Sequence, residues 1–234
     1  MALFERNGRS TDEDILASSD VGTRALSVTA VETDFVAGVY EKLASVYDYV
    51  FGPTLHAGRL QALQRMAIGT ADRILEVGVG TGINLSLYPR DCHVTGIDLS
   101  DSMLEKAHEK VAKNGLRKVR LLQMDASSLS FPDDSFDIVY APYLISVVPD
   151  PVQVACEMRR VCRRGGRIII LNHFRSSGTM LSAIERAISP FTVHIGFKSD
   201  LDLPAFLAQA ELKPVSIEKV NIPPIWSLVT CIKD

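Results

Sequence analysis

The chain has 234 residues, of which 47% are hydrophobic, and its formal net charge is −3. This composition predicts a globular α/β domain with a full core, and it argues against a disordered chain or a main partner that is nucleic acid. No apolar run approaches the roughly 20 residues of a membrane-spanning helix, and no signal peptide is evident. The four cysteines form no C-x-x-C pair. We therefore expect a cytoplasmic protein without a metal site or a disulfide framework.

The N-terminal region divides into a polar arm and a helical segment. Residues 1–30 show little periodicity and are expected to form a loosely ordered arm, which leaves 31–234 as a single domain. Apolar residues at helical spacing predict an amphipathic helix over 35–51. Gly52-Pro53 is expected to end that helix, and a second helix is expected over Leu55–Met66.

From residue 72 onward, predicted strands and helices alternate, which indicates a parallel sheet covered on both faces. The expected strands are Arg73–Val77, His93–Ile97, Val119–Gln123, Phe136–Ala141 and Arg167–Asn172. The helices expected between them are Thr81–Tyr88, Ser102–Lys113 and Pro151–Arg164. The C-terminal part differs, because a helix over Leu203–Ala210 precedes two strand patterns, Pro214–Val220 and Ile225–Ile232. Their short connection predicts an antiparallel pair.

A glycine-rich loop directly follows the first predicted strand. Gly78, Gly80 and Gly82 alternate, so the spacing is G-x-G-x-G and not the G-x-G-x-x-G typical of dinucleotide sites. Glu76 lies two residues before the first glycine, where a carboxylate would repel a pyrophosphate but attract a cationic ligand. S-adenosylmethionine (SAM) carries an ammonium, a sulfonium and a ribose, and has no phosphate. The loop therefore predicts a SAM site.

A second acidic residue supports this interpretation. Asp98 ends the second predicted strand, 22 positions after Glu76, where a carboxylate can accept hydrogen bonds from both ribose hydroxyls. The alternative is that Asp98 only caps the following helix, although Ser100 and Asp101 also suit that task.

Four motifs together resemble class I SAM-dependent methyltransferases: Leu75–Gly82, Gly96–Ser100, Met124-Asp125-Ala126 and Phe131–Asp137. The resemblance implies a Rossmann-like α/β fold with a seven-stranded sheet, the last strand antiparallel and helices on both faces. It also implies that Asp125 contacts the adenine amine and that Ala141-Pro142-Tyr143 lies near the reacting methyl. The expected cofactor-binding residues are Tyr47, Glu76, Gly78, Val79, Gly80, Thr81, Gly82, Asp98, Leu99, Met103, Asp125, Ala126, Ala141 and Pro142.

A narrower resemblance is to bacterial phospholipid (phosphatidylethanolamine) N-methyltransferases. It rests on Tyr47–Gly52, Ile145–Pro151, Leu171–Phe174 and Ile195-Gly196-Phe197. It implies methyl transfer from SAM to phosphatidylethanolamine and its partly methylated forms, by a monomer bound peripherally to the membrane. Two alternatives remain open: a quinone-biosynthesis C-methyltransferase, which shares the Tyr-Asp pair near the N-terminus, and a SAM-binding module without catalysis.

The acceptor side depends on aromatic rings and on donors for a phosphate. A methylated ammonium is a soft cation that aromatic faces hold well, and phosphate oxygens need cationic or imidazole donors. The candidates for catalysis are Tyr47, Tyr143 and His173. The candidates for substrate binding are Tyr40, Tyr143, Asn172, His173, Arg175 and Lys198. The alternative for these residues is a core or surface role, and the 35–51 helix is equally compatible with a membrane-facing lid and with a helix packed on the core.

Overall fold

The computed structural model describes residues 47–175, 201–221 and 224–234, with residues 47–54 described by their backbone only. The predicted arm and most of the 35–51 helix lie outside these residues. The described chain contains a seven-stranded sheet in the order β3-β2-β1-β4-β5-β7-β6. The strands are β1 (Arg73–Val77), β2 (His93–Asp98), β3 (Val119–Gln123), β4 (Phe136–Pro142), β5 (Cys162–His173), β6 (Pro214–Val220) and β7 (Trp226–Ile232). β7 pairs antiparallel with both of its neighbours and the other pairings are parallel, so the predicted sheet is confirmed.

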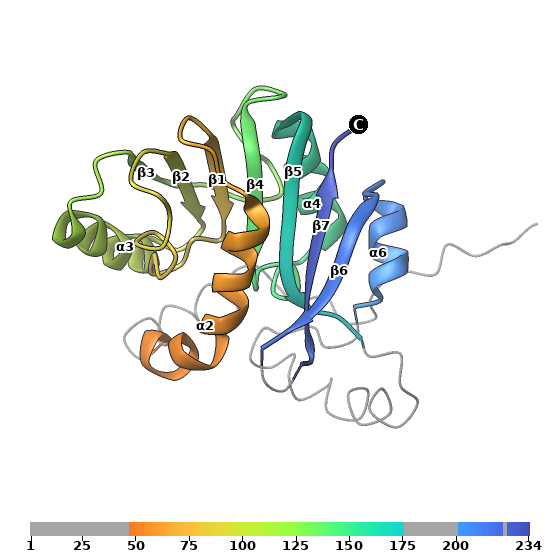
Figure 1. Cartoon of the computed structure of the whole chain (residues 1–234), viewed down its shortest axis with the longest axis horizontal. Coiled ribbons are helices and arrows are strands. Elements are labelled where there is room, and N and C mark those ends of the chain that lie inside the picture. The colour runs from red at the N-terminus through yellow and green to blue at the C-terminus, as the bar shows by residue number, and fades with distance from the viewer. Residues whose placement is uncertain (1–46, 176–200, 222–223) are drawn as a thin grey trace, which may run out of the picture.

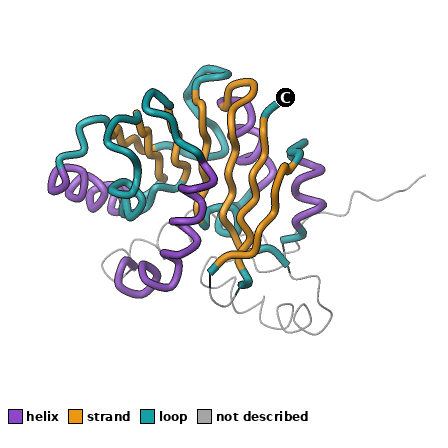
Figure 2. The backbone as a smooth tube through the Cα atoms, in the orientation of Figure 1, coloured by secondary structure: helices purple, strands orange, loops and turns teal. Residues whose placement is uncertain are grey.

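Helices cover both faces of this sheet (Figures 1 and 2). The described helices are α2 (Tyr47–Met66), α3 (Asp101–Asn114), α4 (Pro151–Val161) and α6 (Leu203–Gln209). Side chains from α2 and α3 join one buried cluster, and side chains from α4 and α6 join the other. Successive strand residues alternate between these clusters, as the two-residue period of a strand requires: Ile138 belongs to the first and Val139 to the second.

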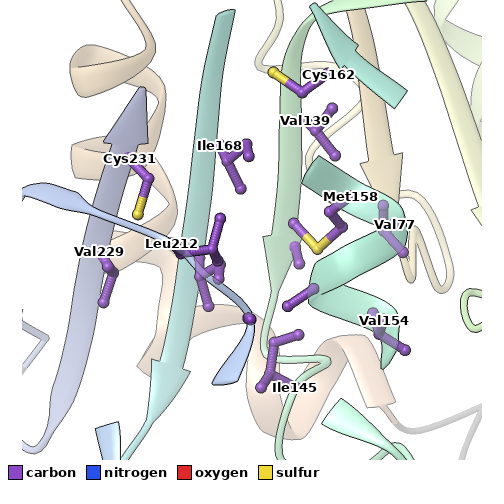
Figure 3. Packing of buried hydrophobic residues seen from close by; sticks show 14 of the residues in the cluster. Val77, Val139, Ile145, Val154, Met158, Cys162, Ile168, Leu212, Val229 and Cys231 are labelled. Carbon is purple, nitrogen blue, oxygen red and sulfur yellow. The ribbon is translucent and has the colours of Figure 1, made fainter. Parts of the chain in front are cut away.

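The packing of α4 on the sheet illustrates how the core holds the fold. Val154 and Met158 of the helix belong to the same buried cluster as Val139 and Ile168 on the central strands (Figure 3). All four side chains are at most 1% exposed. Burying each contributes on the order of 1.5–3 kcal/mol relative to exposure. This layer fixes the carboxyl ends of β1 and β4, where the functional site lies.

Two predicted helix ends and one whole predicted helix are wrong. α2 runs through Gly52-Pro53 without a break, although an interior proline removes one backbone hydrogen bond. Residues 81–88 form successive turns in place of a helix, with Leu85 N bonding to Gly82 O and Leu87 N to Asn84 O. Such i→i+3 bonds are tighter than those of an α-helix.

The helix expected to reach Arg164 ends at Val161. Cys162 already has extended backbone angles and pairs with Phe136. The helix therefore ends three residues earlier, and β5 begins five residues earlier, than the sequence predicts. Gly165, at φ 68°, then allows the turn that returns the chain to the main part of the strand. The remaining predicted elements agree with the structure to within one or two residues.

Candidate active site

A cavity of about 250 Å³ opens at the carboxyl ends of β1, β2 and β4. Ligand sites of open parallel sheets are expected at this edge. Twelve of the residues predicted to contact cofactor or substrate line it. They are Glu76, Gly78, Val79, Gly80, Thr81, Asp98, Leu99, Met103, Asp125, Ala126, Pro142 and Tyr143. Gly82 and Ala141 are not among the lining residues.

All three glycines of the loop have positive φ, and Gly80 and Gly82 have different surroundings. A Cβ on Gly80 would meet nothing within 4 Å, so this backbone borders open space in the cavity wall. A Cβ on Gly82 would lie 2.7 Å from Leu85 and 3.1 Å from Ala107, which is too close for an unshifted structure. The loop thus combines one position open to a ligand with another that lets it pack against α3.

Glu76 is a fully buried carboxylate at the end of β1. It accepts hydrogen bonds from Asn84 Nδ2 and from the Tyr88 hydroxyl, each at 2.6 Å. Burial raises the pKa of this carboxyl to about 7, because the charged form loses its hydration. A buried carboxylate in a ligand cavity is suited to a cationic group that restores the charge balance.

Asp98 is oriented by two backbone donors. Its Oδ2 accepts from Gly80 N at 2.8 Å and its Oδ1 accepts from Ser100 N at 3.0 Å. The N-cap of α3 is Ser100, whose side chain accepts from Met103 N, so Asp98 is not the capping residue. A carboxylate held in this way beside the glycine loop can accept bonds from ribose hydroxyls. Asp125, on the next strand end, accepts from the backbone and hydroxyl of Ser127.

Tyr143 lies where the wall of the cavity meets α2. Its hydroxyl donates to Leu55 O at 3.0 Å and lies 3.1 Å from Asn221 Nδ2. Asn221 Oδ1 also accepts from Gly58 N at 2.6 Å, so the turn after β6 holds α2 in place. The φ of Tyr143 is 58°, a conformation that costs a non-glycine residue on the order of 1–3 kcal/mol and is concentrated at functional sites.

Other predicted acceptor residues do not line the cavity. Asn172 is buried, and its side chain bonds to Ser146 and to the backbone of His173. His173 packs its ring against Trp226, with the centroids 5.7 Å apart. Arg175 pairs with Asp202. Tyr40, Lys198 and the side chain of Tyr47 lie outside the described residues.

The sequence analysis overlooked Arg59, which lines the same cavity and is 4% exposed. Its guanidinium carbon lies 5.0 Å from the centre of the Tyr143 ring. The spacing in the sequence could have indicated its burial. Arg59 lies on the buried stripe of α2 with Leu55, Ala62 and Met66, at spacings of four, three and four residues. An arginine on an apolar stripe is rarely buried without a partner.

Comparison with known proteins agrees with this geometry. Residues 75–170 match the model of a methyltransferase domain. A phosphatidylethanolamine N-methyltransferase of Cereibacter sphaeroides is 43% identical over 79% of this chain and 91% of that protein. The chain belongs to the class I SAM-dependent methyltransferases.

Two further similar proteins share less of their sequence with this methyltransferase. A demethylmenaquinone methyltransferase of Listeria monocytogenes is 33% identical over 62% of this chain and 65% of that protein. A phosphoethanolamine N-methyltransferase of Haemonchus contortus, solved with SAM, has a TM-score of 0.68 at 19% identity. The alignment covers 82% of this chain and 57% of the Haemonchus contortus chain, and this likeness supports the fold alone.

The cavity residues fit SAM as the cofactor of this methyltransferase. Glu76 could accept from the ammonium, Asp98 could accept from the ribose, and exposed Leu99 could provide an apolar surface for the adenine. No three His, Cys, Asp or Glu side chains in the described segments are grouped as a metal site requires. Within the same segments, no helix combines the length and apolarity needed to cross a bilayer.

Proposed function

We propose that this methyltransferase moves methyl groups from SAM to the amine of phosphatidylethanolamine and of its mono- and dimethylated forms. The observation that carries the proposal is the 43% identity to a phosphatidylethanolamine N-methyltransferase across nearly all of that protein. Such identity, with the cofactor cavity present, supports a shared acceptor class more strongly than the fold does, because one fold hosts many functions.

Bound SAM supplies a methyl group on a sulfonium, and the departing thioether needs no proton. The protein must therefore orient the amine in line with the methyl, about 3 Å away, and exclude water. The acceptor-facing wall is suited to this task because it is largely apolar, with Pro142, Leu144, Val147 and Val148 beside Tyr143.

The phospholipid amine arrives as an ammonium and must lose a proton before it can attack. An apolar wall favours the neutral amine, since burial disfavours the charged form. Of the two predicted candidates that the structure describes for accepting this proton, Tyr143 lines the cavity and His173 does not. The Tyr143 hydroxyl already donates to Leu55 O, so we assign its part in catalysis to the ring, which can contact the methylated head group.

We also propose that the reaction takes place at the membrane surface, because the acceptor is a membrane lipid. The predicted helix over 35–51 would cover the cavity there, continuing into α2. Tyr47 at the start of α2 is the residue through which this segment would reach cofactor or substrate, and Tyr40 and Lys198 would contact the head group.

The test is to incubate the enzyme with methyl-labelled SAM and vesicles of phosphatidylethanolamine, then to separate the lipids. We expect label in the mono-, di- and trimethylated products. Labelling of phosphatidylethanolamine at no more than the rate of an enzyme-free blank, with binding of S-adenosylhomocysteine intact, would contradict the proposal and favour a binding role.

The second candidate is C-methylation of a prenylated quinol. It is supported by the 33% identity to a demethylmenaquinone methyltransferase, although this chain covers only 65% of that protein. A parallel incubation with demethylmenaquinol in the same vesicles separates the two. Label found only on the quinol would contradict the phospholipid proposal and identify the quinol as the acceptor.

A further inference from the structure

Arg59 has an unusual environment for a cation. Two of its guanidinium nitrogens, Nε and Nη1, are buried and have no hydrogen-bond partner among the described residues. The Tyr143 ring lies beneath the guanidinium, and Glu76 is close enough to attract it electrostatically. Neither group accepts a hydrogen bond from Nε or Nη1. Since a buried charge without hydrogen bonds is costly, the geometry calls for an anionic partner that the polypeptide itself does not supply.

The position of Arg59 narrows the choice of anion. Arg59 and Glu76 line the same cavity, and both are nine-tenths or more buried. A cation and an anion side by side in one cavity are complementary to a zwitterion. The α-amino acid end of SAM is such a group, because it carries an ammonium and a carboxylate on one carbon. Arginine is well suited to the carboxylate, since two neighbouring N–H groups can bond to both oxygens.

We propose that the guanidinium of Arg59 binds the carboxylate of the methionine part of SAM, while Glu76 accepts from the ammonium. Asp98 and Asp125 hold the nucleoside end of the cofactor, so the two ends are recognised by different elements. Arg59 is the residue through which α2 contacts the cofactor. This assignment does not depend on which acceptor the enzyme methylates.

The test compares two ligands that differ only in the carboxylate: S-adenosylhomocysteine and its decarboxylated analogue. Calorimetry would measure both affinities in the wild type and in Arg59→Met, which keeps an apolar stem of similar shape. We expect Arg59→Met to weaken S-adenosylhomocysteine about 10- to 100-fold, the range for hydrogen bonds to charged groups. The decarboxylated analogue should bind the wild type and the variant equally well.

Arg65→Met serves as the matched control, because Arg65 is on the same helix but is exposed and paired with Glu218. It should leave both affinities unchanged. Equal losses of both ligands in Arg59→Met would overturn the proposal in favour of a packing role. Unchanged binding of S-adenosylhomocysteine, with a raised KM for the phospholipid, would overturn it in favour of the lipid phosphate.

Thermal unfolding gives a second measurement, in which an arginine that binds the cofactor and one that only stabilises the fold behave differently. Removing a buried cation that has unmet hydrogen bonds should leave the Tm of the ligand-free protein unchanged or raise it, while the rise in Tm on adding S-adenosylhomocysteine becomes smaller. If Arg59→Met does not fold, Arg59→Lys decides the question, because it keeps the charge but loses the two-pronged geometry. Arg59→Lys must weaken S-adenosylhomocysteine more than the decarboxylated analogue, and equal losses contradict the proposal.

Discussion

Two parts of the cavity wall differ in the sequence separation of the residues that contact each other. In the cofactor side, around Glu76 and Asp98, the contacting residues are close in sequence. In the α2 side, around Tyr143, they are far apart in sequence. Asn84 and Tyr88 reach Glu76 across 8 and 12 positions, and Gly80 reaches Asp98 across 18. On the other side, Leu55 meets Tyr143 across 88 positions and Gly58 meets Asn221 across 163. The cofactor loop therefore belongs to one β-turn-β unit, while the α2 side forms only when the whole domain closes.

The largest effect is expected on the cofactor side, from Asp98→Ala. This change removes the carboxylate proposed to hold the ribose, together with its bond to Gly80 N in the glycine loop and its bond to Ser100 N at the start of α3. We expect the affinity for S-adenosylhomocysteine to fall about 100-fold or more, since charge-assisted hydrogen bonds are among the strongest. Calorimetry would measure it, with exposed Asp101→Ala as the control. A loss of less than about threefold would remove Asp98 from the site.

A pH titration of stability and of cofactor affinity tests the role of Glu76. Its pKa in the folded protein, about 7, lies above its ordinary value, so the protonated carboxyl is favoured by folding. The stability that this group contributes is full at low pH and is lost as pH rises from 4.5 through 7. Cofactor binding has the opposite sign, because the ammonium requires the carboxylate. We expect the affinity for S-adenosylhomocysteine to rise up to about tenfold per pH unit below 7 and then level off.

Glu76→Gln is the control for that titration. It should remove the rise in affinity near pH 7 and flatten the fall in the stability of the ligand-free protein over pH 4.5–7. Parallel pH profiles for the wild type and Glu76→Gln, measured by calorimetry and thermal unfolding, would show that the carboxyl does not titrate in this range.

The variant Asn221→Ala tests the contacts between α2 and residues distant in sequence. The change leaves Gly58 N, a buried donor, without its acceptor and removes a bond to the Tyr143 hydroxyl. We expect the free energy of unfolding to fall by about 1–3 kcal/mol, measured in denaturant. Asn221→Gly, which also suits the φ of 66°, separates the lost bonds from backbone strain. Wild-type stability in both variants would mean that this turn does not anchor α2.

The smallest effect is expected from Arg65→Ala. Arg65 and Glu218 also connect α2 to β6, at 2.8 Å, but their side chains are 57% and 36% exposed. Exposed ion pairs contribute on the order of 0–1 kcal/mol. Denaturant unfolding should therefore show less change than for Asn221→Ala, and an equal loss would shift the anchoring of α2 from the buried bonds to this surface pair.

The sequence predicted the fold well because most of its elements carry local signals. The alternation of strands and helices and the antiparallel final pair could both be predicted from the sequence. Errors arose where local rules conflict with longer-range demands. Pro53 does not end α2, and Cys162 leaves α4 to pair with Phe136.

The site was predictable to the extent that it is local. Glu76, Asp98 and the glycine loop occur in a recognisable order, and the structure brings them to one cavity. The partners of Glu76, Asn84 and Tyr88, depend on turns that the sequence suggested would be a helix. Arg59 and Asn221 come from distant segments, and only their convergence on Tyr143 shows that they belong to the site.

The most direct test of the proposed function is a competition within one membrane. Vesicles containing equal amounts of phosphatidylethanolamine and demethylmenaquinol would be incubated with the enzyme and SAM carrying a deuterated methyl group, and the lipids analysed by mass spectrometry. We predict that the trideuteromethyl mass appears on phosphatidylethanolamine first, followed by products with two and three such groups. Its appearance on the quinol alone, or on neither lipid while S-adenosylhomocysteine binds, would contradict the account.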